Sequence, residues 1–239
     1  MKVWIIGYGK MGKEIHRQLT ERGYPEPFIS ERLTPEILAN PEITSCEVAI
    51  EFTHPEAAVH NYLQIFSTGI PLVSGTTGWL NQEDKILKAR EEFDSGFFYA
   101  SNFSPGMYLF RKMHRELARQ MNRFPQYEVS MEESHHLQKQ DAPSGTAISL
   151  AQDLLDELDS KNSWVCNQPA QAHQIPITAH RIGEVPGTHQ VRYESAFDDI
   201  SIQHDAKSRA GFAWGAIEAA LFMRGKKGFF TLENLYGEK

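Results

Sequence analysis

Apolar residues in the first hundred positions form short runs that alternate with segments of helical spacing. Residues 2–7 form one such run, and Met11, Ile15 and Leu19 then recur every four residues, which is the spacing of one helix face. Strand-like runs follow at 27–30, 46–52, 71–75 and 96–101, and helices are expected at 55–67 and 80–93. Strands that alternate with helices in this way predict a parallel sheet covered on both faces.

The pattern changes after residue 102. A long helix is expected at 105–121, and residues 127–134, 189–195 and 199–206 then alternate polar and apolar positions, as strands do when one face meets water or a partner. Further helices are expected at 144–158 and 208–222, and the polar stretch 161–174 is expected to be a loop. The predicted fold class is therefore α/β: a Rossmann-type parallel-sheet lobe and, from about 103 to 206, a smaller α+β lobe.

Composition narrows the class of protein further. The 239 residues include 24 Lys and Arg against 31 Asp and Glu, for a net charge of −7, which argues against nucleic acid as a partner. Apolar runs stay well short of the roughly 18–20 residues that a membrane span needs. Cys46 and Cys166 are far apart and form no CxxC motif, so a disulfide framework is not expected. We expect a cytoplasmic globular protein that binds neither nucleic acid nor membrane.

A GxGxxG motif follows the first predicted strand and begins the first predicted helix. It consists of Gly7, Tyr8, Gly9, Lys10, Met11 and Gly12. Such glycines allow the backbone to approach a pyrophosphate at a helix N-terminus. Glu31 lies about where an acidic residue would accept hydrogen bonds from the adenosine ribose, whereas the adjacent Arg32 would attract a 2′-phosphate. The pair leaves NADH and NADPH both open as cofactor.

Two further loops follow predicted parallel strands. Ligands of open α/β sheets bind at the C-terminal ends of the strands, so both loops are expected to line the cofactor crevice unless they are ordinary turns. The residues concerned are Gly75, Thr76 and Thr77 in one loop, and Ala100, Ser101, Asn102 and Phe103 in the other.

A cationic segment stands out in this acidic chain. His135, His136 and Lys139 precede a predicted helix start at Gly145 and Thr146, whose free backbone N–H groups favour anions. This combination predicts a site for a small substrate with more than one carboxylate and a titratable group beside it. Adjacent histidines lack the spacing of an HExxH zinc site, and the chain has no GxSxG motif, so neither a metal nor a serine nucleophile is expected.

The motifs together resemble one known family. EESHHLQKQDAPSGTA at 132–147, with GYGKMG, SGTTG and ASNFSPG earlier in the chain, is similar to the 4-hydroxy-tetrahydrodipicolinate reductase (dihydrodipicolinate reductase) family of lysine and diaminopimelate biosynthesis. The likeness continues in order through 181–183, 187–189 and 204–216. It implies that the chain reduces 4-hydroxy-tetrahydrodipicolinate to tetrahydrodipicolinate with NADH or NADPH, with loss of water.

The resemblance also implies roles for individual residues. His135 would be the general acid, and Lys139 would offset the negative charge that develops on the substrate. His136, Gly145 and Thr146 would hold the substrate carboxylates. The glycine motif, Glu31, Arg32 and the two strand-end loops would bind the dinucleotide. The implied domains are residues 1–104 plus 207–239 for the dinucleotide, and residues 105–206 for the substrate and for assembly into a homotetramer.

Some positions depart from the family pattern, and two alternatives follow from the residues. Glu51 stands where Asp is usual, and Leu137 and Gln138 replace an often basic pair. The alternatives are another NAD(P)-dependent oxidoreductase acting on an amino-acid-like carboxylate, such as a diaminopimelate dehydrogenase type, and a non-catalytic NAD(P)H sensor. A sensor would not need His135 and Lys139 at a nicotinamide.

Overall fold

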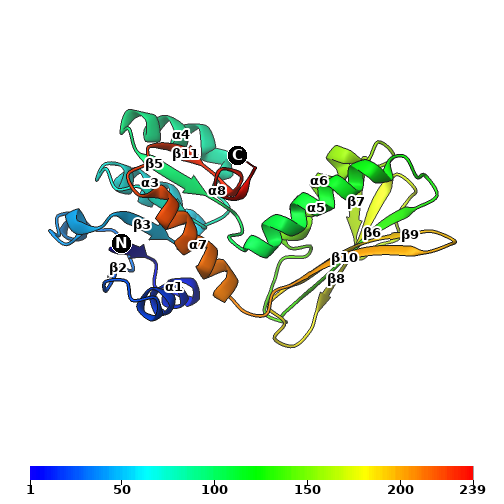
Figure 1. Ribbon diagram of the computed structural model, residues 1–239, viewed down its shortest axis with the longest axis horizontal. Coiled ribbons are helices and arrows are strands. Elements are labelled where there is room, and N and C mark those ends of the chain that lie inside the picture. Colours follow the sequence, from blue (N-terminus) through cyan, green and yellow to red (C-terminus); the bar gives the residue numbers. More distant parts are fainter. Residues whose placement is uncertain (239) are drawn as a thin grey trace. The chain divides into compact units, whose positions relative to one another are not determined.

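The structure, a computed structural model, describes residues 1–238 and divides into two compact units (Figure 1). Unit 1 comprises Met1–Ser104 and Arg209–Lys239, and unit 2 comprises Pro105–Ser208. The chain thus leaves unit 1 once, builds unit 2, and returns.

Unit 1 is built on a six-stranded parallel sheet in the order β11-β5-β4-β3-β1-β2. This confirms the predicted parallel sheet. The strands are β1 (Val3–Ile6), β2 (Phe28–Ser30), β3 (Val48–Glu51), β4 (Leu72–Ser74), β5 (Gly96–Tyr99) and β11 (Gly228–Phe230). The helices are α1 (Lys10–Glu21), α2 (Pro35–Leu38), α3 (Pro55–Phe66), α4 (Glu83–Glu92), α7 (Ala210–Met223) and α8 (Leu232–Tyr236), with 3-10 turns η1 (Ile43–Ser45) and η2 (Leu80–Gln82).

Two apolar clusters hold the helices of unit 1 on opposite faces of the sheet. Ile5 lies in one cluster with residues of α1 and α7, and the next residue along the chain, Ile6, lies in the other with residues of α3 and α4. Because successive side chains of a strand point to opposite faces, a continuous apolar run such as β1 fits a sheet that is buried on both sides.

Unit 2 contains a five-stranded mixed sheet in the order β10-β9-β6-β8-β7. Helices α5 (Pro105–Met121) and α6 (Gly145–Glu157) pack against one face of it (Figure 1). The other face carries polar residues such as Ser130, Thr178 and Arg192, and within the described part of unit 2 no helix covers it. The strands are β6 (Glu128–His135), β7 (Ser163–Cys166), β8 (Gln174–Arg181), β9 (Thr188–Glu194) and β10 (Asp199–Asp205).

The predicted loop at 161–174 is wrong in part, because β7 lies within it. This strand has four half-buried residues and pairs with β8 at the edge of the sheet. Its backbone hydrogen bonds define it, and an edge strand this short shows no alternation of buried and exposed positions. The sequence reading also missed β8, which contains Pro176 and pairs with β6, and β11, which adds a sixth strand from the C-terminal part of the chain.

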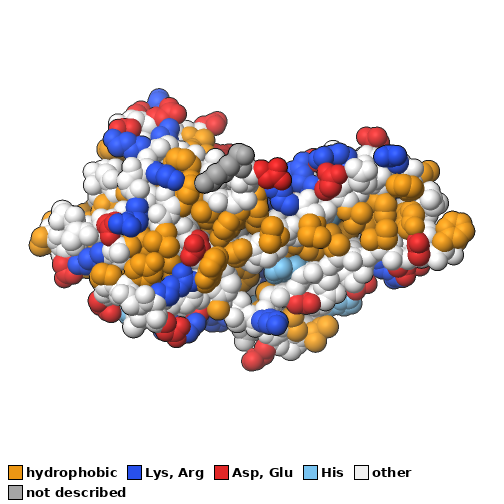
Figure 2. Space-filling model, in the orientation of Figure 1, with side chains coloured by type: hydrophobic (Ala, Val, Ile, Leu, Met, Phe, Trp, Pro, Cys, Tyr) orange, Lys and Arg blue, Asp and Glu red, His pale blue; other side chains and the backbone are white. Residues whose placement is uncertain are grey.

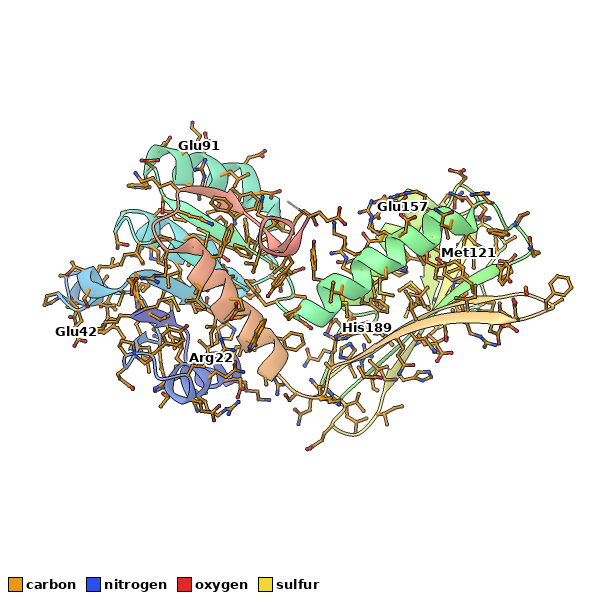
Figure 3. All side chains as sticks on the ribbon, in the orientation of Figure 1. Arg22, Glu42, Glu91, Met121, Glu157 and His189 are labelled. Carbon is orange, nitrogen blue, oxygen red and sulfur yellow. The ribbon has the colours of Figure 1, made fainter. Side chains whose placement is uncertain are left out.

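Ion pairs tie α5 to α6 in unit 2. Arg111 donates two hydrogen bonds of 2.8 Å to the buried carboxylate of Asp153, and Arg115 lies 2.8 Å from Glu157 (labelled in Figure 3). Figure 2 shows Lys and Arg side chains gathered along this part of unit 2. These ion pairs lie in the C-terminal half of α6 and hold the two helices of unit 2 together.

Candidate active site

A groove of about 930 Å³ lies in unit 1 at the C-terminal ends of the parallel strands. It brings together most of the residues predicted to bind a dinucleotide, from three separate segments of the chain. Those that line it are Gly7, Tyr8, Gly9, Lys10, Met11, Glu31, Arg32, Gly75, Thr76 and Thr77.

The glycine motif packs too closely against neighbouring backbone to admit side chains at Gly7 and Gly12. Gly7 has a φ of +88°, and a Cβ there would lie 2.2 Å from the carbonyl oxygen of Phe52. A Cβ on Gly12 would lie 2.2 Å from the carbonyl oxygen of Gly7. Gly9 precedes α1, and among residues 1–238 no side chain caps that helix start. Its free N–H groups therefore suit the pyrophosphate of a dinucleotide.

The predicted cofactor loop of Ala100, Ser101, Asn102 and Phe103 does not line this groove. Among residues 1–238, the groove is lined by other segments. Phe103 is buried in the apolar core and packs edge-on against Phe52, with 5.8 Å between ring centroids. The side chain of Asn102 accepts the backbone N–H of Ser104 at 2.9 Å. The side chains of Phe103 and Asn102 are thus occupied within the protein, and the exposed part of this loop is Ser101.

A buried carboxyl supports the loops of the groove. Glu51, at the end of β3, accepts hydrogen bonds from the hydroxyls of Ser74 (2.6 Å), Thr76 (3.0 Å) and Thr53. Burial raises the pKa of Glu51, and the hydroxyl hydrogen bonds oppose that shift. Thr53 and Thr76 also line the groove, so this carboxyl fixes the ends of β3 and β4 where a ligand would lie.

In unit 2, the end of β6 places Glu133 and His135 on the same buried face of the sheet. His189 of β9 (labelled in Figure 3) pairs in register with Glu133. Atom Oε2 of Glu133 lies 3.5 Å from Nε2 of His135 and 3.7 Å from Nε2 of His189. The two imidazole rings are 5.2 Å apart between centroids. One carboxylate oxygen thus faces two histidines.

The other oxygen of Glu133 anchors the carboxylate to two neighbouring elements. Oε1 accepts the backbone N–H of Ser144 at 3.0 Å and hydrogen bonds from the Arg181 guanidinium at 3.2 and 3.3 Å. Burial by itself would raise the pKa of Glu133, but the contact from His135 and the hydrogen bonds from Ser144 lower it to about 2. Glu133 is therefore a carboxylate at neutral pH.

The loop between β6 and α6 carries Lys139. Its ammonium group lies 2.8 Å from Asp141, and Arg181 donates to the carbonyl oxygens of both Lys139 (3.3 Å) and Asp141. Ser144 caps α6 by accepting the N–H of Ala147 at 3.1 Å. The first N–H groups of α6, which the helix itself cannot use, thus begin a few residues after Lys139.

Glu133, His135 and His189 place one possible ligand atom each within 4.8 Å of one another, a spacing that a metal ion could also use. The guanidinium of Arg181 already lies against the Glu133 carboxylate. A second cation beside it would be repelled, so the charges favour an ion-pair network over a metal site.

The structure thus brings His135 and Lys139 to the same end of unit 2 as the α6 start. Three members of this cluster, namely Glu133, Arg181 and His189, received no role from the sequence, although all three lie in stretches that resemble the family. A signal for Glu133 existed, because it falls on the apolar side of an alternating strand, where a charged residue is rarely placed without a partner. Apart from that resemblance, Arg181 and His189 gave no signal of a role, since it depends on the pairing of β8 and β9 with β6.

Protonation of His189 is expected to destabilise the protein in acid. Burial, and then the neighbouring His135, lower the pKa of His189 from 6.5 to about 4. The unfolded chain binds this proton more readily than the folded protein does. The contribution of neutral His189 to the free energy of unfolding is therefore complete above pH 6.5, and it is lost as the pH falls toward 4, by on the order of 3 kcal/mol. Urea unfolding at both ends of this window should show a smaller loss for His189→Asn than for the unchanged protein. The exposed control His173→Asn should keep the full loss, and equal losses in all three proteins would contradict this assignment.

None of the helices described, through residue 238, is long and apolar enough to cross a membrane.

The parallel sheet with its glycine-lined groove, together with the mixed-sheet unit and its histidine–lysine cluster, defines a nicotinamide-dependent oxidoreductase of the Rossmann type. Two family models match the chain: "Dihydrodipicolinate reductase, N-terminus" over residues 32–103 and "Dihydrodipicolinate reductase, C-terminus" over residues 106–236. The chain belongs to the dihydrodipicolinate reductase family.

Individual relatives agree with the family models. A 4-hydroxy-tetrahydrodipicolinate reductase of Christiangramia forsetii is 42% identical over 240 residues, which span 100% of this chain and 98% of the relative. One of Staphylococcus carnosus is 32% identical and spans 98% and 99%. The solved dipicolinate-bound dihydrodipicolinate reductase from Paenisporosarcina sp. TG-14 has a TM-score of 0.73 at 24% identity, over 98% of this chain and 99% of that chain. That structural likeness shows the fold.

Proposed function

We propose that this chain reduces 4-hydroxy-tetrahydrodipicolinate to tetrahydrodipicolinate with NADH or NADPH, in the lysine and diaminopimelate pathway. The observation that carries the proposal is the cluster in unit 2, where His135 and Lys139 lie at the same end of the unit as the start of α6 in a protein of net charge −7. A histidine and a lysine beside the free N–H groups of a helix start suit a small dianionic substrate. Family membership supports it and favours neither another amino-acid-type oxidoreductase nor a sensor.

The cofactor part of the proposal rests on the groove in unit 1. A bound nicotinamide would supply the hydride. The N–H groups after Gly9 would hold the pyrophosphate, and Glu31 would accept hydrogen bonds from the adenosine ribose. Gly75, Thr76 and Thr77 would lie along the nicotinamide end, with Ser101 and the backbone of its loop offering further contacts. In this account residues 1–104 and 207–239 form the dinucleotide domain.

The substrate part rests on unit 2, as residues 105–206. His136 and the first N–H groups of α6, at Gly145 and Thr146, would bind the carboxylates of the substrate. Lys139 would stabilise the negative charge that develops after hydride addition. His135 would donate the proton that completes the reduction, since an imidazole suits proton transfer near neutral pH.

Assembly and location complete the proposal. The polar face of the mixed sheet, with Ser130, Thr178 and Arg192, is suited to pack against other copies of the chain, and we place a homotetramer there. Cys46 and Cys166 are both free thiols, which is compatible with the cytoplasm.

The direct test is an assay of the purified protein with the condensation product of pyruvate and aspartate semialdehyde. Reduced nicotinamide should be consumed only when that product is present. Tight cofactor binding without turnover would instead favour the sensor, and turnover with diaminopimelate would favour the dehydrogenase alternative.

Removing the Arg32 side chain tests the choice between the two cofactors. If the Arg32 guanidinium binds a 2′-phosphate, Arg32→Ala should lower kcat/KM for NADPH by about 10- to 100-fold, as expected for a charge-assisted hydrogen bond. The value for NADH should change less than about 2-fold, since that cofactor lacks the phosphate. Arg17→Ala, on the outer face of α1, is the matched control. An equal loss with both cofactors would contradict the phosphate contact.

A further inference from the structure

Glu133 is a buried carboxylate on the face of β6 that begins with apolar residues and ends with His135. It is 1% exposed and follows the buried residues Val129 and Met131 on the same side of the strand. An ionised carboxylate in such a place is costly unless it is paired and hydrogen-bonded. Apolar packing would not stabilise this carboxylate, so the polar groups around it must do so.

The two oxygens of Glu133 have different environments. Oε1 is held by Ser144 at the start of α6 and by Arg181 at the end of β8, which fixes the carboxylate in position. Oε2 faces Nε2 of His135 at 3.5 Å. Within residues 1–238 neither of these two atoms makes a hydrogen bond, either to the other or to a third group. The unused capacity of the carboxylate is therefore directed at one ring nitrogen of His135.

His189 does not replace His135 in this role. Its Nε2 lies 3.2 Å from the Ser144 hydroxyl, which gives that nitrogen a partner. The pKa of His189 is lowered to about 4 by burial and by His135, so the ring stays neutral at pH 7. His135 is therefore the ring beside Oε2 that would carry positive charge during the reaction.

Gly187 lies close to the His135 ring. A Cβ added to Gly187 would lie 2.9 Å from Cε1 and 3.3 Å from Nδ1 of His135. A side chain at position 187 would therefore collide with the ring, and glycine there leaves the imidazole its space.

We propose that Glu133 is the positioning residue for His135: it accepts the Nε2–H of the ring and so leaves Nδ1 to carry the proton that the substrate receives. This inference rests on the proposed function, in which His135 is the acid. As the Nδ1–H bond breaks, a C–H bond forms on the reduced substrate, and the ring is left neutral with its proton on Nε2. The carboxylate stabilises the protonated ring before transfer and selects the tautomer that remains afterwards.

Other charged or titratable groups lie around Glu133 and His135, and each strand or loop packed against these two residues contributes at least one. They are His189 on β9, Arg181 on β8, His204 on β10, Cys166 on β7, and Lys139 and Asp141 in the loop after β6. Of these, Arg181 holds Oε1 of Glu133, while Oε2 of Glu133 faces His135 from 3.5 Å.

The first test uses the unchanged protein and needs no substrate. ¹⁵N NMR of the histidine rings, with His135 assigned by its loss in His135→Gln, should show the neutral His135 ring protonated at Nε2. A neutral ring protonated at Nδ1 would overturn the proposal, as would a stoichiometric metal ion found by elemental analysis of the purified protein. The measurement itself is made on the unchanged protein, and His135→Gln serves only to assign the signal.

The second test follows the pH profile of kcat/KM. If the Glu133 carboxylate positions the acid, its removal in Glu133→Gln should move the profile to lower pH. Glu133→Asp, which keeps the charge, should return the profile toward that of the unchanged protein. Glu116→Gln, on the exposed face of α5, should leave it in place.

A folded Glu133→Gln protein with the unchanged pH profile would overturn the proposal. Failure of the unchanged protein to reduce the substrate would overturn the proposed function instead, and the NMR result would still decide where the ring proton lies.

Discussion

Replacing His135 by glutamine is expected to lower kcat by about 10²- to 10⁴-fold, the range that general acid catalysis contributes. The amide of glutamine can still donate a hydrogen bond to Glu133, so the buried carboxylate keeps a partner and the fold should hold. Glutamine cannot transfer a proton, however, and the step that completes the reduction would depend on water. KM for the substrate should change little, because the carboxylates are bound by other groups. Steady-state kinetics at neutral pH measures both constants.

His173→Gln is the matched control for this variant, since His173 is exposed in a loop of the same unit. It should keep the kinetic constants of the unchanged protein. Dinucleotide binding should be equal in all three proteins, because the groove lies in unit 1. A His135→Gln protein with kcat within about 2-fold of the unchanged value would remove His135 from the mechanism.

Lys139→Ala is expected to lower kcat/KM by about 10²- to 10³-fold, with losses in both kcat and substrate affinity. The ammonium group of Lys139 is paired with Asp141 at 2.8 Å, and Arg181 holds the backbone of this loop. A dianionic substrate would compete with Asp141 for the ammonium, and the charge that develops in the reaction would strengthen the contact. Groups that stabilise developing charge contribute about 2.7–4 kcal/mol.

Two controls separate charge from structure at this position. Lys88→Ala removes an exposed lysine on α4 and should have no effect. Asp141→Asn removes the competing carboxylate and should lower KM or leave it unchanged. If Lys139→Ala raised KM and left kcat intact, Lys139 would bind the substrate without assisting the chemical step.

Local sequence patterns predicted the main elements of both units. The apolar run of β1 and the four-residue spacing of Met11, Ile15 and Leu19 determine a strand and a helix by themselves, and the repeat of that unit implies a parallel sheet. β7 and β8 escaped prediction for a physical reason. β7 is short, half-buried and at the sheet edge, and β8 contains a proline, so both depend on pairing with other strands.

The candidate site was likewise predictable only in part. The glycine motif and the segment from His135 to Thr146 are continuous in sequence, and their chemistry could be inferred from residue type and spacing. The contact between Glu133 and Arg181 joins residues 48 positions apart, and that between Ser144 and His189 joins residues 45 apart. Only the registers of β6 with β8 and β9 bring these groups together.

Deuterium transfer tests the central claim most directly. The protein is incubated with 4-hydroxy-tetrahydrodipicolinate and with NADH or NADPH that carries deuterium at the transferable position of C4, and the product is analysed by mass spectrometry. The account predicts tetrahydrodipicolinate that is heavier by one deuterium, and much less of it with the His135→Gln protein. A product without deuterium, or no product while the dinucleotide remains bound and reduced, would contradict the account.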